Sequence, residues 1–479
     1  YKQLDVESSK LLARALEANT TLSWLNLDGL DLDLLELRGT KPADALDLSN
    51  KNIGDTSGVI IAKLLETNDV LTDLQLQFNS RMGTESARAL ARAISVNGTL
   101  TRLDVRGLRL GAAGMHAIGE ALICSSTSKL CLLACDSFTL DSDVMLYDAH
   151  SLAPSAATLL SGVLKTNTIV EMLKLDGVDL VVDYLKGYRR EGAMEAVHRE
   201  QFDPCKKVAL VNKGLGTVAG IILARLMESN TILEELQLRN NQLGVRAAHH
   251  LARALDGNST LKTINLAGNA LCGVRFEKGV YDTSGIVAIA DALQTNRVLT
   301  SLSLAGTQCD ASSGIGSSGF IALAKALQTN SALTELQLQH NTNVGVEGVE
   351  AVARAIQVSS TLKTLNVSGT SLGMIGYQSL VDALRSDPAL TSLNLGGNGL
   401  GVHGSRAFAE ALQVNRKLLK LDMSSNSLGA EGGEALAKVL QGANSTLTKL
   451  ECRSNELRAA KQVLLAMVEQ RAAPLALRL

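Results

Sequence analysis

Apolar and polar residues follow one another along this chain in an order that recurs roughly every 28 residues. In the line Leu390-x-x-Leu393-x-Leu395 the apolar residues alternate with polar ones, which predicts a short strand with one buried face. In the stretch that follows such a line, for example residues 435–440, apolar residues stand three and four apart, which predicts a helix with one buried stripe. A single strand–helix unit of this kind cannot bury its own apolar face, so the pattern predicts stacked repeats.

Polar residues and glycines mark the register of each repeat. An Asn after the strand, such as Asn398, suits a tight turn, where its side chain can hydrogen-bond backbone groups. A Gly after the last Leu of a line permits a positive φ at the bend into the helix, and it occurs at Gly244, Gly373, Gly401 and Gly429. A second Asn closes each helix, three residues before the next strand's first apolar residue; it stands at Asn19, Asn68, Asn97, Asn167, Asn230, Asn258, Asn296, Asn330, Asn415 and Asn444.

Together with degenerate turns at Ser126, Ser359 and Asp387, these marks predict about 13 strand–helix units. The strands are expected to begin near Leu22, Leu71, Leu100, Thr127, Val170, Leu233, Leu261, Leu299, Leu333, Leu362, Leu390, Leu418 and Leu447.

This pattern resembles the leucine-rich repeats of the ribonuclease-inhibitor-like subtype, because a full Ala-rich helix fits into each long period. The resemblance covers essentially the whole chain. It implies an α/β fold: a right-handed horseshoe-shaped solenoid with a parallel sheet on the concave face and helices on the convex face. We therefore expect residues 1–479 to form a single solenoid. Inhibitors, NOD-like receptors, Ran GTPase-activating proteins and axonemal proteins share the subtype, so the resemblance is not specific for function.

Several periods are longer than the others, and their extra residues fall between strand and helix, on one rim of the expected solenoid. These insertions cover approximately residues 30–45, 133–152, 178–207, 272–284 and 307–316. Two of them resemble each other, because residues 46–54 and 208–216 each restore a strand-like line before the helix resumes. The same excursion has evidently been built twice, which predicts ordered units rather than random loops.

Aromatic residues concentrate in these insertions, at Phe138, Tyr147, Tyr184, Tyr188, Phe202, Phe276 and Tyr281. Two explanations stay open. Bulky side chains can anchor long loops onto the rim, or they can contact a partner, since protein interfaces favour Tyr and Arg as energetic centres. The insertion 178–207 is the first choice for a partner contact because it combines Tyr184, Tyr188, Arg189, Arg190 and Phe202.

The outward positions of the strand lines predict the character of the concave face. Its middle is short, neutral and polar, as at Ser301 and Ser303, whereas charged residues gather at both ends. The candidate contact residues on this face are Trp24, Arg102, Arg106, Glu235 and Arg239. The alternative is a solvated sheet face without a partner.

Composition narrows the partners. The net charge is −2 with both signs interspersed, which predicts binding to neither nucleic acid nor an acidic membrane surface. No apolar run approaches the ~18 residues of a membrane span. Seven cysteines at irregular positions fit a reducing, intracellular and cytoplasmic setting, with which a cilium or flagellum is also compatible. Cys124, Cys131 and Cys135 lack a CxxC pair or a nearby His, so we predict no metal site. Cys131 and Cys452, on strand lines, are expected to be buried.

No P-loop, nucleophile elbow or HExxH motif is present, so we expect neither an enzyme nor a cofactor. The preferred hypothesis is a non-catalytic scaffold that binds protein partners through rim insertions, the concave face or both, for example as a component of a ciliary axoneme. The alternatives are a small-GTPase regulator similar to Ran GTPase-activating protein, or the ligand-sensing repeats of a NOD-like receptor. The former family typically carries an acidic tail, whereas this chain ends in residues 471–479 without an acidic residue.

The two ends carry separate expectations. The first helix presents Leu11 and Leu12 with nothing upstream to cover them, so we expect a missing segment or a partner there. At the other end, the segment that starts at Pro474 is expected to fold over the last helix as a cap.

Overall fold

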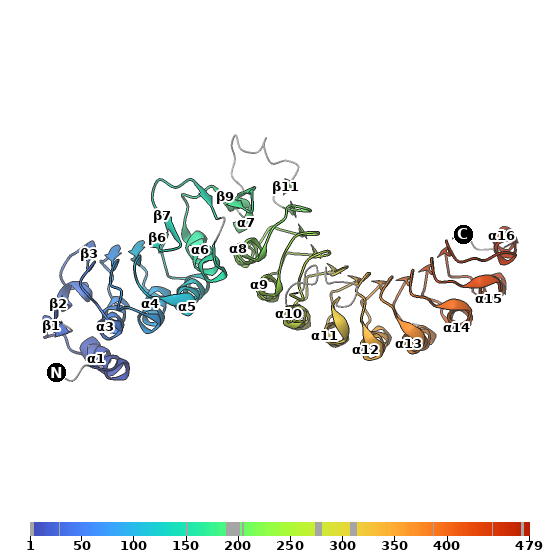
Figure 1. The fold of residues 1–479 in the computed structure, drawn as a ribbon, viewed down its shortest axis with the longest axis horizontal. Coiled ribbons are helices and arrows are strands. Elements are labelled where there is room, and N and C mark those ends of the chain that lie inside the picture. Colours follow the sequence, from blue (N-terminus) through green and yellow to red (C-terminus); the bar gives the residue numbers. More distant parts are fainter. Residues whose placement is uncertain are drawn as a thin grey trace. The chain divides into compact units, whose positions relative to one another are not determined.

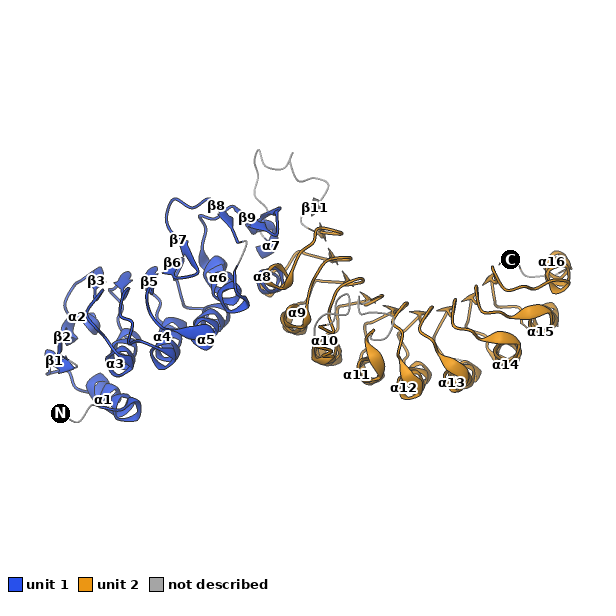
Figure 2. Cartoon of the chain, in the orientation of Figure 1, with its two compact units in different colours: residues 1–188, 221–227 blue, residues 189–220, 228–479 orange. Residues whose placement is uncertain are grey.

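The computed structural model describes residues 4–27, 29–149, 152–187, 206–273, 280–306, 314–386, 388–442, 444–470 and 474–479, and the backbone of residues 202–203. The chain divides into two compact units, coloured separately in Figure 2. Unit 1 comprises residues 1–188 and 221–227, and unit 2 comprises residues 189–220 and 228–479. Helix α8 (Thr217–Met227) therefore contributes to both units.

Unit 1 alternates strands and helices in the order that the sequence predicts. Its helices are α1 (Val6–Ala18), α2 (Leu34–Leu37), α3 (Asp55–Leu65), α4 (Thr84–Val96), α5 (Gly111–Cys124), α6 (Pro154–Thr166) and α7 (Val182–Lys186). Its strands are β1 (Trp24–Leu27), β2 (Leu30–Asp33), β3 (Ala45–Asp47), β4 (Asp73–Gln75), β5 (Arg102–Asp104), β6 (Leu132–Cys135), β7 (Phe138–Leu140), β8 (Leu146–Asp148), β9 (Met172–Leu175) and β10 (Val178–Val181). They form three sheets, β1-β2, β3-β4-β5-β6-β7 and β10-β9-β8.

Unit 2 is more regular and contains one sheet, from β11 to β21 in chain order. Its strands are β11 (Phe202–Asp203), β12 (Lys207–Ala209), β13 (Glu235–Gln237), β14 (Thr263–Asn265), β15 (Ser301–Ser303), β16 (Glu335–Gln337), β17 (Thr364–Asn366), β18 (Ser392–Asn394), β19 (Lys420–Asp422), β20 (Lys449–Glu451) and β21 (Ala476–Arg478). Its helices are α9 (Val245–Gly257), α10 (Ser284–Thr295), α11 (Gly316–Thr329), α12 (Gly345–Val358), α13 (Gly373–Arg385), α14 (Gly401–Val414), α15 (Gly429–Gly442) and α16 (Ala460–Gln470).

The sheet of unit 2 is parallel from β12 to β21, while β11 pairs antiparallel with β12. Its parallel part follows directly from the alternating apolar positions. The middle residues of successive strands pair with one another, for example Leu365 with Leu393 and Leu393 with Leu421, and all three are buried. The residues on either side of them point to the face of the sheet that the helices do not cover. We call this face the strand face. The helices α9–α16 lie on the other side of the sheet (Figure 1). The predicted α/β solenoid of parallel strands and covering helices is confirmed; a single solenoid over both units stays a prediction.

The helix-closing asparagines, which the sequence marks only as a register, also link neighbouring repeats. Asn97 is buried, its side-chain oxygen accepts hydrogen bonds from the backbone N–H of Thr99 and Leu100, and its amide donates to the carbonyls of Leu65 and Asn68. Asn97 thus pairs backbone groups on two repeats that would otherwise be buried without partners. The degenerate turn at Ser359 has the same role, since its hydroxyl accepts from the N–H of Leu362.

The predicted turn at Ser126 and the predicted strand start near Thr127 need correction. The fourth expected strand does not begin near Thr127, because Ser125 rather than Ser126 takes the place of the Asn and accepts from the N–H of Thr127. Two further residues follow, so Leu130 is the first buried apolar residue and β6 begins at Leu132. This shift leaves Cys131 half-buried, whereas Cys452 is buried as predicted and burial raises its pKa to about 12.

The glycine prediction holds for Gly373, Gly401 and Gly429, which have φ values of 66°, 62° and 65°. Gly244 does not use this freedom, since its φ is −99°. A glycine is still required there, because a Cβ would lie 2.8 Å from the hydroxyl of Thr217. Close approach, rather than a left-handed backbone, therefore selects the residue.

Unit 1 departs from a purely parallel arrangement through antiparallel hairpins. β1 pairs antiparallel with β2, β6 with β7 and β9 with β10, and the last two pairs are each joined by a two-residue turn. Consequently β1, the first expected strand, does not join a parallel sheet, and Trp24 does not lie on the expected concave floor. The strand-like lines that follow the two similar insertions become β3 and β12, which do pair in parallel with β4 and β13, as that prediction required.

The C-terminal segment also behaves differently from the expectation. It does not fold over α16; β21 instead pairs in parallel with β20 and extends the sheet, with Ala476 opposite Lys449. Leu475 is buried in this arrangement. The unpaired edge of a strand offers a full row of hydrogen-bond partners, whereas a helix surface offers none to a backbone, so pairing with the sheet satisfies more groups.

Helices α5 and α6 pack closely enough to make a glycine essential. A Cβ at Gly119 would lie 2.7 Å from the backbone of Thr158 and Leu159 on α6. Alanine in a helix normally stabilises by ~1 kcal/mol relative to glycine. We expect Gly119→Ala to destabilise unit 1 by about 1–3 kcal/mol instead, because backbone cannot move aside as a flexible side chain can. Urea denaturation followed by circular dichroism measures this.

The matched control is Gly257→Ala at the end of α9, where nothing lies within 4 Å of the new Cβ. That variant should be neutral or more stable than the wild type. A gain in stability at both positions would mean that α5 and α6 are farther apart than described.

Candidate interaction surface

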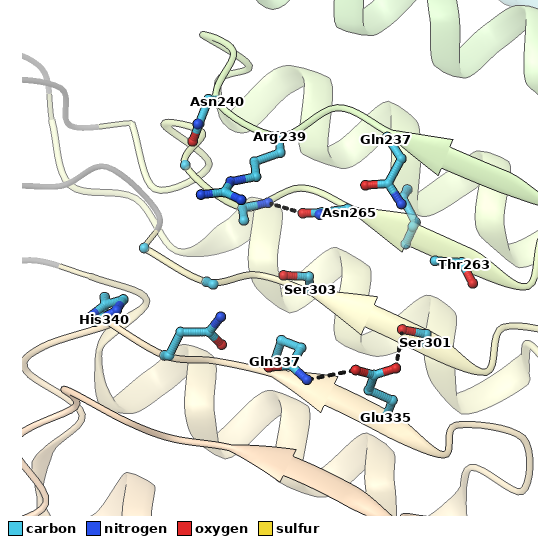
Figure 3. A pocket seen from close by; sticks show the side chains of 16 residues that line it. Gln237, Arg239, Asn240, Thr263, Asn265, Ser301, Ser303, Glu335, Gln337 and His340 are labelled. Carbon is cyan, nitrogen blue, oxygen red and sulfur yellow. Dashed lines mark hydrogen bonds between the residues drawn. The ribbon is translucent and has the colours of Figure 1, made fainter. Parts of the chain in front are cut away.

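A hollow of about 480 Å³ lies on the strand face of unit 2, across β13, β14, β15 and β16 (Figure 3). We call it the unit 2 hollow. Its lining consists of Gln237, Arg239, Asn240, Thr263, Ile264, Asn265, Ala267, Gly268, Ser301, Ser303, Ala305, Gly306, Glu335, Gln337, Gln339 and His340.

The hollow arises from side-chain size in four consecutive repeats. The two middle strands, β14 and β15, carry the small residues Thr263, Ser301 and Ser303, which form a low polar floor. The strand on each side carries a Glu-Leu-Gln sequence, and its long side chains form walls. Strands in a sheet lie ≈ 4.7–4.9 Å apart, so the walls stand ~14 Å from each other, which is wide enough for one extended chain.

One end of the hollow, where the strands begin, is acidic. The carboxylate of Glu335 accepts hydrogen bonds from Gln337 at 2.7 Å and from the hydroxyl of Ser301 at 3.1 Å, as Figure 3 shows. No cation among the described residues pairs with Glu335. Its counterpart Glu235 on β13 does have one, since Lys207 lies 2.7 Å away, and this hydrogen bond holds the pKa of Glu235 below its usual value.

The other end of the hollow gathers groups without intramolecular partners. The exposed side chains of Arg239 and His340 make no hydrogen bond or ion pair with the described residues. Beside them the buried side-chain oxygen of Gln339 has no partner within the same residues. Figure 3 shows Arg239 and His340 at the end of the hollow opposite Glu335.

A column of left-handed backbone positions shapes this end. In the regular repeats the third residue after the strand has a positive φ, and Asn240, Gly268, Gly306 and His340 are four consecutive members with φ of 56°, 68°, 49° and 59°. We call this the positive-φ column. The side-chain oxygen of Asn240 lies over Gly268, whereas Gly306 leaves a notch beside His340, because the nearest atom to a Cβ at Gly306 would be 3.8 Å away.

The other charged candidates on the strand face already have partners. The guanidinium of Arg102 lies 2.7 Å from the carboxylate of Asp141, and Arg106 donates to the buried carboxylate of Asp104 at 3.0 Å. In each case part of the cation's binding capacity is used within unit 1. Arg239 is therefore the candidate that the structure leaves best placed to meet a partner, while Trp24 lies on the separate β1-β2 sheet with 58% of its surface exposed.

Among the insertion aromatics, the described ones favour the anchoring explanation. Phe138 is buried and its ring meets that of Tyr147 edge-on at 6.3 Å. The hydroxyl of Tyr281 donates to the carbonyl of Ile315. Tyr184 is half-buried on α7. The remaining candidates, namely Tyr188, Arg189, Arg190, the side chain of Phe202, and Phe276, lie outside the described residues.

The two similar excursions of unit 1 are held by the same kind of contact, a cation that donates to backbone carbonyls. Each ends in a cation that follows or closes a short helix: Arg38 after α2 and Lys186 at the end of α7. Arg38 donates to the carbonyls of Leu16 and Leu22, and Lys186 donates to that of Asn167. Burial lowers the pKa of Lys186 to about 8. In the parts that the structure describes, both excursions are held by such contacts; that the second is ordered throughout stays a prediction, because residues 188–201 lie outside the described residues.

Sequence reasoning missed Phe78, a solvent-exposed ring on a left-handed backbone. Phe78 belongs to the positive-φ column with φ of 65°, and 61% of its surface is exposed. The other described members of this column are Asn50, Gly107, Asn212, Asn240, Gly268, Gly306, His340, Gly369, Gly397, Ser425 and Ser454. Stacking the repeats in the sequence would have revealed a Phe where all others are Asn, Gly, His or Ser.

Because Phe tolerates this backbone poorly, we expect Phe78→Asn to stabilise unit 1 by about 0.5–1 kcal/mol in urea denaturation. The reciprocal change, Asn240→Phe, provides the control, since Gly268 follows Asn240 in the column as Gly107 follows Phe78. It should destabilise unit 2 by about 1 kcal/mol. Stabilisation by a Phe at both positions would show that the ring contact outweighs the backbone strain.

The described residues add two observations on other site types. They contain no cluster of three or more His, Cys, Asp or Glu side chains that could hold a metal ion. None of their helices has the length and apolar character that crossing a membrane requires.

Two short segments of the chain match a known family model. The family model described as "Leucine Rich repeat" matches residues 329–353 and 414–437. Among solved structures, the chain is similar to the leucine-rich repeat-containing protein LegL7 from Legionella pneumophila, with 21% identity, coverage of 48% of this chain and 70% of that one, and a TM-score of 0.32. It is also similar to leiomodin-1 actin-binding site 2, with 18% identity, coverage of 39% and 87%, and a TM-score of 0.25. No curated protein matches the chain.

Proposed function

We propose that this chain, whose strand–helix units are leucine-rich repeats, is a non-catalytic scaffold that binds a protein partner on the strand face of unit 2. The observation that carries the proposal is the unit 2 hollow, with its small polar floor between two walls of longer side chains. A segment of a partner can lie on this floor and exchange water for hydrogen bonds with the hydroxyl and amide groups around it. The proposal includes the ribonuclease-inhibitor-like subtype, one continuous solenoid and a cytoplasmic or ciliary location.

The lining favours a polypeptide over a compact small molecule. Small-molecule sites are concave and mostly apolar with few polar groups. The unit 2 hollow is open, and its floor and walls present polar side chains such as Asn265, Ser303 and Gln337 in rows along the strands. Rows of amides and hydroxyls suit the repeating N–H and C=O groups of an extended chain.

The test fills the hollow without touching the core. Ser301 and Ser392 occupy the same register position on β15 and β18, but only Ser301 lines the hollow. Partners captured by the wild-type protein would be purified, and their affinity would be measured for Ser301→Trp and for Ser392→Trp. We expect the first variant to lose at least about tenfold in affinity and the second to bind as the wild type does.

The rim insertion 178–207 is the competing contact surface, and the same partners decide between the two. A variant with Ser at positions 188, 189 and 190 removes Tyr188, Arg189 and Arg190. Loss of binding in this variant, with full binding by Ser301→Trp, would overturn the hollow as the contact surface.

A further inference from the structure

The unit 2 hollow carries opposite unpaired charges at its two ends. Arg239 stands at the end where the strands terminate and Glu335 at the end where they begin (Figure 3). Neither has an ion-pair partner among the described residues, although ion pairs occur at neighbouring places, such as Lys207 with Glu235. The hollow is therefore polarised along the strand direction.

The Arg239 end is shaped to receive an anionic side chain. The guanidinium offers several N–H donors in a planar fork that matches a carboxylate. The notch at Gly306 lets a ligand approach the backbone closely, because the place of its missing Cβ is open. Across the notch, the exposed side chain of His340 has no partner in the described residues, and its ring can donate an N–H to a carboxylate.

We propose that the unit 2 hollow binds an extended peptide segment of a partner protein through an Asp or Glu carboxylate held between Arg239 and His340. The inference rests on the proposed function and names the partner's chemistry. The charge at the opposite end adds a second requirement. Glu335 and Gln339 are four residues apart on one strand line, which corresponds to ~13 Å in an extended chain. A Lys or Arg four to six residues from the acidic residue therefore reaches Glu335.

The charge complementarity selects this occupant over others. A uniformly acidic segment would meet Glu335, and a uniformly basic one would meet Arg239, so either would leave one end repelled. A segment with one charge of each sign satisfies both ends and has only one favourable direction along the strands. The small floor between the ends, at Thr263 and Ser303, accommodates short or neutral side chains.

The test uses an array of synthetic ten-residue peptides of random sequence, probed with the purified full chain. We expect the bound peptides to be enriched in Asp or Glu, with Lys or Arg four to six positions away. Arg239→Ala should weaken the best of these peptides by about tenfold or more, as loss of a charge-assisted hydrogen bond does. Arg239→Glu should shift the selection from acidic to basic residues.

The control is Arg246→Glu, which makes the same charge change on the exposed surface of helix α9 and should leave the selection unchanged. The proposal is overturned if no peptide binds, if bound peptides lack an acidic residue, or if Arg239→Glu selects the same sequences as the wild type. Binding confined to added phosphoserine peptides would equally overturn the choice of a carboxylate.

Failure of this inference can be told apart from failure of the proposed function. Peptides that bind without acidic enrichment but are lost in Ser301→Trp would refute the anionic site and retain the hollow as the contact surface. Peptides that bind Ser301→Trp as well as the wild type would refute both.

Discussion

The Asn426→Ala variant should lose about 3–5 kcal/mol in the free energy of unfolding of unit 2, because it leaves several buried backbone groups unpaired. The Asn426 side chain is fully buried. Its amide donates to the carbonyls of Leu395 and Met423, both at 2.9 Å, and its oxygen accepts from the N–H of Asn398 at 2.9 Å. Alanine replaces none of these bonds, and the site is too enclosed for solvent to restore them all.

Asn394→Ala in the preceding repeat is the matched control. Asn394 is half-buried on the strand face, and its side-chain oxygen accepts one hydrogen bond, from the N–H of Gly396. Its loss should cost no more than about 0.5 kcal/mol, since water can replace a partner there. Chemical denaturation measures both variants, and hydrogen exchange of β18–β20 locates the effect, because repeats can unfold locally. Equal losses would mean that the hydrogen bonds of Asn426 do not stabilise the turns between repeats.

Leu393→Ala should cost about 2–5 kcal/mol, through lost apolar contacts and the cavity that remains. Leu393 is buried in the middle of β18, between Leu365 and Leu421 of the flanking strands. The adjacent Ser392 points to the strand face, so Ser392→Ala should change stability by less than ~0.5 kcal/mol. Similar losses from both changes in urea denaturation would show that the inward and outward positions are exchanged by one residue.

The regular part of the fold was predictable because each element depends on local chemistry that the sequence repeats. The leucine positions fix the strands, and an Asn or its substitute Ser359 fixes the turns. The hairpins were harder. The β1 line has the same apolar pattern as a sheet strand, and the pattern alone cannot say which neighbour it pairs with. The sequence between β1 and β2 and that between β9 and β10 are both Asp-Gly, which is a hairpin signal, but the β6-β7 hairpin turns at Asp136-Ser137 and lacks it.

The residue types of the candidate site were predictable from the sequence, but its shape was not. The sequence indicates a short polar floor and places Arg239 on the strand face. The hollow itself depends on which repeats are neighbours. Its walls at Gln237 and Gln337 are separated by two strands that carry small residues. The notch also requires the positive-φ column, which brings His340 opposite Asn240. The rim candidate Tyr188 stays a prediction, because it lies outside the described residues.

The buried asparagines that close the helices also determine how the protein changes chemically over time. Asn97 is followed by Gly98, the pairing in which the glycine nitrogen most readily attacks the asparagine side chain and converts it to aspartate or isoaspartate. In the folded state the Asn97 side chain is immobilised by its bonds to Leu65 and Leu100, which hold it away from that attack. Unfolding releases it. A carboxylate formed there cannot donate to the two carbonyls that Asn97 serves, so each excursion to the unfolded state risks a permanent chemical lesion that blocks refolding.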